Sequence, residues 1–342
     1  MTETTINRIP QRRLPRIPLD VSVLGFGSAP IGDLFALLDD GTAIATAERA
    51  AALGITYFDT APFYGQGLAE HRLGTALRRR GDAATVVSTK VGRLMRPAPQ
   101  GRTSGYLGGH PFDVVHDYSY DGAMRSLEHS QLRLGRASVD ILYIHDADAW
   151  THGPVEGPKR YAEAMAGAYR ALDDLRRQGV VKAIGVGTND PDYAARFLTE
   201  GDFDCLLIAG RYSLLEQPAL DTVFPIAQRK GVGVMLGGVF NSGILATGPI
   251  QGAKYNYADA PADVLARVGK IEAVCRRHGV ALATAALQFC LGHPAVTSVV
   301  LGAVMPEEVE RNVASLAVPV PAALWRSLKD EGLLGAGVPT PT

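Results

Sequence analysis

Two hydrophobic periods alternate along the chain. Short runs of almost continuous apolar residues are typical of parallel strands buried on both faces. Such runs begin at positions 21, 55, 85, 139, 181, 203, 231 and 297. Between them lie segments with apolar residues at helical spacing, several of which end in glycine, a residue that favours helix C-termini. These predicted helices cover residues 41–54, 69–81, 122–135, 162–179 and 263–279.

Alternating strands and helices indicate βαβ units, and eight such units close into a barrel. We therefore predict an α/β protein of the (β/α)8 TIM-barrel class, with one domain over residues 1–342. Residues 1–20 precede the barrel, and we expect them to cover the end opposite the active site. An open doubly wound sheet is the alternative, but the glycines Gly25 and Gly27 stop short of the G-x-G-x-x-G pattern that such sheets carry.

Three connections are longer than the usual short loop, at residues 92–120, 146–160 and 239–262. Each one follows a strand. They should therefore lie at the carboxyl-end face of the barrel, where barrel enzymes keep their active sites. We expect them to wall a substrate site.

Composition removes several classes of function. Lys and Arg number 34 and Asp and Glu 35, and this balance argues against a nucleic-acid binder or a protein of basic membrane surfaces. No apolar stretch reaches the length of a membrane span, and no signal peptide is evident, so a cytoplasmic location is expected. The three cysteines are sparse and sit in apolar surroundings, which suits buried thiols, and no metal site is expected. The oligomeric state has no sequence signal.

Ionisable residues mark the ends of three consecutive predicted strands. Asp59, Lys90 and His145 close the runs that begin at positions 55, 85 and 139, and Tyr64 follows Asp59 by five residues. Taken singly, these could be a helix cap, a half-buried aromatic or a core histidine. Lys90 is harder to explain that way, because a buried ammonium needs a partner. A barrel brings the three strand ends side by side.

The grouping suggests redox chemistry at a carbonyl carbon. Asp59 can neutralise Lys90, and Lys90 beside Tyr64 should lower the tyrosine pKa from about 10. Tyr64 can then exchange a proton with a carbonyl or alcohol oxygen, while His145 orients that oxygen. None of these side chains carries hydride, so a nicotinamide cofactor must do so.

Residues 54–65 read GITYFDTAPFYG and resemble the G-x-x-x-F-D-T-A-x-x-Y-G signature of the aldo-keto reductase family. The resemblance extends from LGFGSAPIGD near Gly27 to the PEEVERN segment that ends at Asn312. It implies a catalytic tetrad of Asp59, Tyr64, Lys90 and His145, with Tyr64 as the acid/base.

Further segments resemble one branch of that family. They include DYSYDGAMRSLEHSQLRLG, HDADAWTHG and GVFNSGIL, and the branch holds D-threo-aldose 1-dehydrogenases, L-fucose and L-galactose dehydrogenases and pyridoxal 4-dehydrogenases. This resemblance implies an NAD-dependent oxidoreductase that converts the hemiacetal carbon of an L-fucose-, L-galactose- or D-arabinose-like aldose, or of pyridoxal, to a lactone. We expect Tyr106 and Trp150, from the long loops, to contact this substrate together with Tyr64 and His145.

The resemblance also implies cofactor contacts. Gly27 and Ser28 match the first contact in the family, and Thr188 with Asn189 matches the Ser-Asn pair that holds the carboxamide. Relatives commonly have a glutamine after the sixth strand and a ring-stacking tyrosine after the seventh. This chain has Ala209 in the first region, and Gly238 with Phe240 in the second. Phe240 or Tyr212 is therefore the candidate to pack on the nicotinamide.

Cofactor choice is predicted from residues 300–312. The family resemblance implies that NADP-using relatives hold the 2′-phosphate of the cofactor with a lysine and an arginine, because a phosphate needs cationic partners. Aligning Asn312 places Gly302 and Glu308 at those positions. We therefore expect NAD to be preferred over NADP, and the combination of Glu308→Arg with Gly302→Lys to narrow that preference.

Three alternatives remain at this stage. The first is an NADPH-dependent aldehyde or ketone reductase of the same superfamily. The second is a non-catalytic, cofactor-binding partner subunit of a membrane channel, against which the intact tetrad argues. The third is a hydrolase that uses Asp59 with Asp146, the one other carboxylate at a comparable strand end.

Overall fold

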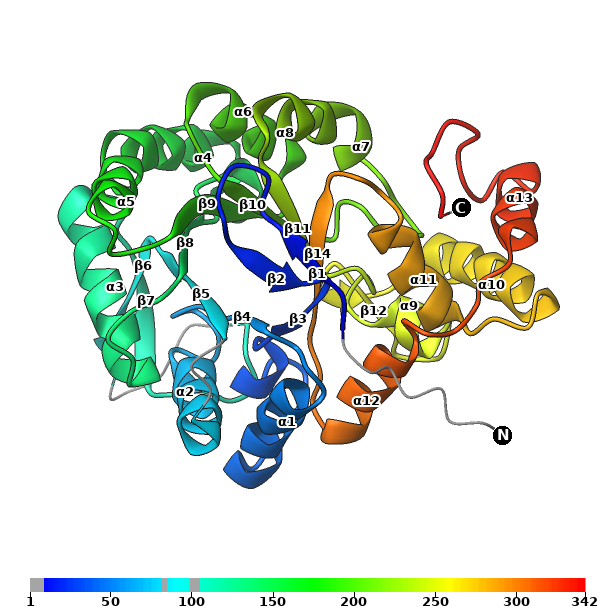
Figure 1. The fold of residues 1–342 in the computed structure, drawn as a ribbon, viewed down its shortest axis with the longest axis horizontal. Helices are drawn as coiled ribbons and strands as arrows, with labels where there is room; N and C mark the ends of the chain where they lie inside the picture. The colour runs from blue at the N-terminus through cyan, green and yellow to red at the C-terminus, as the bar shows by residue number, and fades with distance from the viewer. Residues whose placement is uncertain (1–8, 82–84, 99–104, 342) are drawn as a thin grey trace.

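A closed barrel of eight parallel strands forms the centre of the computed structural model, which describes residues 9–81, 85–98 and 105–341 (Figure 1). The strands neighbour one another in the order β10, β11, β14, β3, β4, β5, β8, β9. Their bounds are β3 Leu24–Gly27, β4 Tyr57–Asp59, β5 Val86–Val91, β8 Ile141–His145, β9 Ala183–Thr188, β10 Cys205–Ala209, β11 Gly233–Gly237 and β14 Val296–Leu301. Seven of the eight predicted apolar runs contain one of these strands and the eighth, from position 297, overlaps β14, so the (β/α)8 fold is confirmed.

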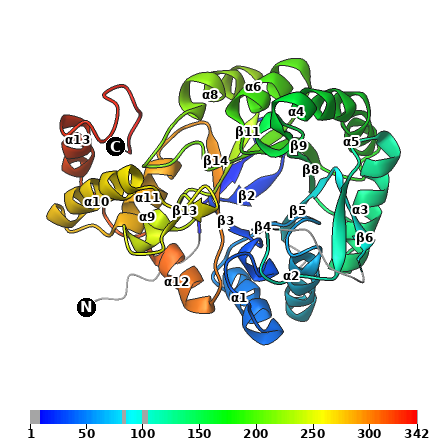
Figure 2. The ribbon, with the colours of Figure 1, turned by 180° about the vertical axis from the view of Figure 1, so that it is seen from behind.

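Helices surround the barrel on its outside, as both ribbon views show (Figure 2). The predicted helical segments contain or overlap α1 Asp40–Ala52, α2 Leu68–Arg80, α3 Tyr120–Leu134, α5 Ala168–Arg177 and α10 Ala262–Arg277. The helical patterns named from the sequence did not include a second group: α6 Pro191–Glu200, α7 Ala219–Thr222, α8 Phe224–Lys230, α9 Ile244–Thr247, α11 Leu282–Leu291, α12 Pro306–Ala314 and α13 Ala322–Asp330. None of the helices in these described ranges is long and apolar enough to cross a membrane.

The expected long loop at residues 146–160 is largely wrong. Helix α4, Ala149–Ala166, begins three residues after the loop was expected to start. The Asp148 side chain caps it by accepting a hydrogen bond from the Thr151 amide at 2.8 Å. Gly153, with φ of 75°, and two prolines interrupt the helix, and these residues hid its periodicity in the sequence.

Short antiparallel pairs order parts of the other two long connections. Strands β6 Arg93–Pro97 and β7 Phe112–His116 form a hairpin after β5, and β12 Lys254–Tyr255 pairs with β13 Ala258–Asp259 after β11. Residues 99–104, within the first connection, lie outside the described residues.

The N-terminal segment covers the opposite end of the barrel, as expected for its described part. Strands β1 Gln11–Arg13 and β2 Asp20–Ser22 pair antiparallel across the barrel opening (Figure 1). Leu14, Leu19 and Val21 are buried with the interior tyrosines Tyr57 and Tyr143. This apolar contact fills the interior of the barrel at its base.

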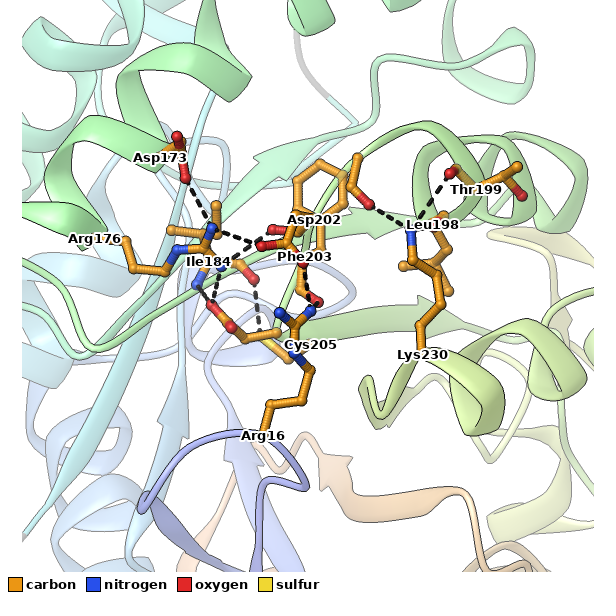
Figure 3. Close-up of polar contacts among 12 residues, drawn as sticks. Arg16, Asp173, Arg176, Ile184, Leu198, Thr199, Asp202, Phe203, Cys205 and Lys230 are labelled. Carbon is orange, nitrogen blue, oxygen red and sulfur yellow. Dashed lines mark hydrogen bonds and ion pairs between the residues drawn. The ribbon is translucent and has the colours of Figure 1, made fainter.

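A polar network links the N-terminal turn to the outer helices at this base (Figure 3). Arg16 donates to Asp202 Oδ1 at 2.6 Å, and Arg176 of α5 donates to Asp204 Oδ2 at 3.0 Å. Lys230, the last residue of α8, donates to the carbonyl oxygens of Leu198 and Gly201 at 2.6 and 2.8 Å. Lys230 therefore satisfies carbonyls at the C-terminal end of α6 that have no partner within that helix.

The strand register stacks inward-facing side chains in two layers. The hydroxyl of Tyr57 lies 3.1 Å from the hydroxyls of both Ser88 and Tyr143, so these three residues form one layer. Side chains on one face of a strand recur every second residue. Two residues further along, the same strands contribute Asp59, Lys90 and His145 to the layer nearer the carboxyl ends. Gly185 of β9 makes room for the lower layer, because a Cβ there would lie 2.7 Å from the Tyr143 ring.

Candidate active site

A cavity of about 360 Å³ opens at the carboxyl-end face. Its lining includes seven of the residues expected from the sequence, namely Tyr64, Lys90, Tyr106, His145, Trp150, Thr188 and Asn189. Phe35, Phe63 and Tyr257 add aromatic surface. The cavity is therefore an aromatic-walled pocket with ionisable groups from three neighbouring strands and the connections that follow them.

Asp59, Lys90 and Tyr64 form one chain of polar contacts. Lys90 Nζ lies 2.7 Å from Asp59 Oδ2, 2.8 Å from the Thr60 carbonyl oxygen and 3.0 Å from Tyr64 Oη. Ser88 Oγ donates to the other Asp59 oxygen at 2.7 Å. Because Lys90 and Asp59 are both buried, this pairing is what allows an ammonium to remain inside the barrel.

The expected lowering of the Tyr64 pKa is wrong for this site. Burial raises the pKa of Tyr64 well above 10, and the nearby Asp59 carboxylate raises it further. Burial also lowers the pKa of Lys90, although Asp59 opposes that shift. The physical reason is that Asp59 neutralises the ammonium, so Lys90 does not act on Tyr64 as an isolated positive charge. Tyr64 is therefore protonated at neutral pH.

His145 faces the same cavity as a neutral imidazole. Burial lowers its pKa well below 6.5, and the positive charges of Arg93 and Lys90 lower it further. Its Nε2 lies 3.3 Å from Asp146 Oδ2, and its buried Nδ1 has no hydrogen-bond partner among the described residues. Neutral imidazole can exchange hydrogen bonds with a substrate oxygen without adding charge to the pocket.

A second buried ion pair was missed at the sequence level. Arg93, the first residue of β6, donates from Nη2 to Asp146 Oδ2 at 2.8 Å, and both residues line the cavity. The guanidinium carbon lies 4.2 Å from the centroid of the Phe63 ring. Arg93 follows β5 by two residues, so the criterion of a charged group at a strand end could have found it. Asp146 is committed to this pair, which disfavours the hydrolase alternative.

The predicted cofactor residues near β3 and β9 can accommodate a polar ligand. Ser28 Oγ is buried without a hydrogen-bond partner in the described structure, just past the carboxyl end of β3 and next to Gly27. Asn189 lines the cavity, while its Nδ2 donates to the Ala209 carbonyl oxygen at 3.0 Å. Thr188 Oγ1 donates to Asp148 Oδ2 at 2.5 Å, so its hydroxyl proton is already used within the protein. These groups fit a nicotinamide cofactor through Ser28 Oγ and the remaining acceptor of Asn189.

The aromatic residues proposed to pack on the nicotinamide lie elsewhere. Phe240 packs against the hydrophobic core and is absent from the cavity lining, as is its neighbour Gly238. Tyr212 is buried, with its ring stacked 5.1 Å from that of Phe289. Tyr257, between β12 and β13, lines the cavity instead, and its ring stacks with Phe35 at 6.5 Å. The missed aromatic thus comes from a two-residue hairpin with no strong sequence signal.

Gly302, Glu308 and Asn312 lie outside the cavity, after β14 and on α12. Glu308 Oε2 accepts a hydrogen bond from the Val304 amide at 2.8 Å, which closes the turn before α12. A Cβ at Gly302 would lie 2.4 Å from Pro30 Cγ. A side chain at position 302 would therefore displace Pro30, and the expected effect of Gly302→Lys on cofactor preference stays a prediction.

A parallel (β/α)8 barrel that brings Asp59, Tyr64, Lys90 and His145 together at its carboxyl-end face is typical of barrel-fold oxidoreductases. The chain belongs to the aldo/keto reductase family, whose model matches residues 23–330. Members of this family use nicotinamide cofactors and small-molecule substrates.

Two relatives match over nearly their full length. The chain is 43% identical to a pyridoxal 4-dehydrogenase from Microbacterium luteolum over 335 residues, covering 95% of this chain and 98% of the relative. It is 40% identical to a D-threo-aldose 1-dehydrogenase from a Pseudomonas species over 332 residues, covering 94% and 96%. Among solved structures, the holo form of an aldo-keto reductase from Bacillus halodurans superposes with a TM-score of 0.73 at 25% identity, covering 97% and 98% of the two chains.

Proposed function

We propose that this protein is an NAD-dependent dehydrogenase that oxidises the hemiacetal carbon of an aldose, or of pyridoxal in its cyclic form, to a lactone. The observation that carries the proposal is the contact of Lys90 Nζ with Tyr64 Oη at 3.0 Å, in a cavity shared with His145. The names of the two relatives at 40% identity or more, one acting on pyridoxal and one on an aldose, support this substrate class.

In this proposal Tyr64 exchanges the proton of the reacting hydroxyl. Its raised pKa makes it a proton donor in the reductive direction. In the oxidative direction it accepts the hydroxyl proton only after losing its own, and Lys90 Nζ, 3.0 Å from Tyr64 Oη, can donate a hydrogen bond to the resulting phenolate. His145, as a neutral imidazole, orients the reacting oxygen. A bound nicotinamide supplies hydride transfer, which no side chain here can supply.

We further propose that the cofactor contacts Gly27, Ser28 and Asn189, and that Glu308 governs the choice of NAD. A carboxylate repels the 2′-phosphate of NADP but accepts hydrogen bonds from ribose hydroxyls. No positive charge replaces it at position 302, where Pro30 leaves no space for a side chain.

The test is a screen for NAD reduction, followed by nicotinamide absorbance, over L-fucose, L-galactose, D-arabinose, L-glucose and pyridoxal, repeated with NADP. Oxidation of at least one of these with NAD, and formation of the lactone, are expected. Turnover confined to NADPH-dependent reduction of simple aldehydes would replace this proposal with the reductase alternative. Absence of any turnover would favour a cofactor-binding partner subunit.

A further inference from the structure

Arg93 retains hydrogen-bonding capacity that the protein itself does not use. Its side chain is 4% exposed, and it lines the cavity with Tyr64 and His145. One nitrogen, Nη2, is paired with Asp146, while Nε and Nη1 have no hydrogen-bond partner among the described residues. Leaving donors of a buried guanidinium unpaired is unfavourable, because they have lost water without gaining an acceptor.

The guanidinium is held in place by contacts that engage only its Nη2 and its face. Asp146 binds it on one side, and the Phe63 ring lies against it at 4.2 Å. Asp146 is itself fixed, since its amide donates to the Gly187 carbonyl oxygen at 2.9 Å and its own carbonyl accepts from Tyr118 Oη at 3.0 Å. A fixed donor costs little entropy to use when a ligand binds.

Arg93 lies close to His145, at the end of the cavity where we place the reaction. The same Asp146 oxygen that accepts from Arg93 Nη2 lies 3.3 Å from His145 Nε2. One carboxylate oxygen therefore separates the guanidinium from the imidazole that we place at the reacting oxygen. An acceptor bound by Arg93 belongs to a substrate atom close to the reacting carbon.

We propose that Arg93 is a specificity-determining residue that donates to an oxygen on the carbon adjacent to the reacting carbon, so that the preferred substrates are 2-hydroxyaldehydes, their cyclic hemiacetals and aromatic aldehydes with an ortho oxygen. The inference rests on the proposed function for the location of the reacting carbon. Aldoses carry this oxygen as the 2-hydroxyl, and pyridoxal carries it as the ring 3-oxygen. The chemistry is shared, and the experiment separates the two sources.

The test crosses a substrate deletion with a side-chain deletion. We compare kcat/KM for D-arabinose with 2-deoxy-D-arabinose, for pyridoxal with 3-deoxypyridoxal, and, in the reductive direction, for lactaldehyde with propionaldehyde. Wild-type protein is expected to prefer the oxygen-bearing member by about 10- to 100-fold, because a charged donor left unpaired is costly. The Arg93→Met variant is expected to lose that preference by slowing the oxygen-bearing member about 10- to 100-fold more than the deoxy member.

Each outcome either supports or overturns the proposed role of Arg93. Preference in the arabinose pair alone assigns the site to aldoses, and preference in the pyridoxal pair alone assigns it to the aromatic substrate. Equal use of the members of every pair by the wild type overturns the role of Arg93 without any variant. If Arg93→Met does not fold, as judged by circular dichroism, Arg93→Lys replaces it and is expected to keep part of the preference. Equal slowing of both members of a pair, in either variant, shows that Arg93 is only structural.

The reductive pair separates this inference from the proposed function. Failure to oxidise any aldose or pyridoxal rejects the proposed function, yet a preference for lactaldehyde that Arg93→Met removes still supports Arg93. Oxidation of aldoses without any preference for the adjacent oxygen supports the proposed function and rejects the role of Arg93. Absence of turnover with all three pairs overturns both.

Discussion

The Asp146 carboxylate lies 3.3 Å from the imidazole Nε2 of His145, the residue immediately before it in the chain. This contact depends on an unusual backbone conformation, because Asp146 has a φ of 51°, in the left-handed region. Tyr118 Oη stabilises the bend by donating to the carbonyl oxygens of both residues, at 2.7 and 3.0 Å. A strained residue of this kind is typical of functional sites.

This contact predicts an acid limb in the pH profile. Burial raises the pKa of Asp146 to about 6, so kcat/KM should rise with pH through about 6 as Asp146 becomes ionised and pairs with Arg93. His145 does not titrate in this window, since its pKa is far lower. The titratable and charged groups that act on this pair are Arg93, Lys90, His116 and Asp148.

The measurement is kcat/KM between pH 5 and 9 for wild type, Asp146→Asn and the surface control Glu156→Gln. The limb should disappear in Asp146→Asn and persist in the control. An unchanged limb in Asp146→Asn assigns it to another group. Stability follows the opposite direction, because a carboxyl whose folded pKa exceeds 3.8 makes the fold less stable as pH rises from about 4 to about 6.

Tyr64→Phe should abolish most of the activity. The substitution keeps the ring and removes the hydroxyl that contacts Lys90, and loss of an acid/base group costs about 10²- to 10⁴-fold in rate. Steady-state turnover and cofactor binding by fluorescence measure the effect, and binding should survive. Tyr169→Phe is the matched control, because Tyr169 lies on α5 and its hydroxyl accepts from the Asp202 amide, away from the cavity. Turnover of Tyr64→Phe within threefold of wild type would be incompatible with its proposed role.

Glu308→Gln should narrow the preference for NAD. We expect wild type to favour NAD over NADP by at least about tenfold in kcat/KM, equivalent to about 1.4 kcal/mol. Glutamine removes the charge and keeps an oxygen that can accept from the Val304 amide, so the turn before α12 is retained. Glu307→Gln is the control, since Glu307 is an exposed neighbour on the same helix. Equal use of both cofactors by wild type would contradict the assignment of Glu308.

Lys230→Met should lower stability without affecting catalysis. Its ammonium donates to the carbonyl oxygens of Leu198, Thr199 and Gly201 at 2.6, 3.3 and 2.8 Å, at the base of the barrel (Figure 3). Loss of these contacts is expected to cost about 1–2 kcal/mol in the free energy of unfolding. Urea unfolding measures it, with the exposed neighbour Arg229→Met as the control. An unfolding free energy equal to that of the control would show that water replaces the lysine fully.

The sequence by itself determined the barrel and the core of its site. Strands buried on both faces leave continuous apolar runs, and an ionisable residue at the end of such a run is conspicuous, as for Asp59, Lys90 and His145. Neighbouring parallel strands then bring their carboxyl ends together, so these residues had to meet. Patterns of this kind can be recognised in the sequence because they involve residues that are close together in the chain.

Tertiary structure decided what depends on contacts between distant segments. The Arg93–Asp146 pair joins residues 53 positions apart, and the exclusion of a side chain at Gly302 comes from Pro30. The Tyr64 pKa likewise followed from burial and from Asp59 neutralising Lys90, rather than from the nearness of Lys90 alone. Sequence spacing indicates which groups meet, but burial and net charge at the meeting point set their protonation, and only the packed barrel fixes those quantities.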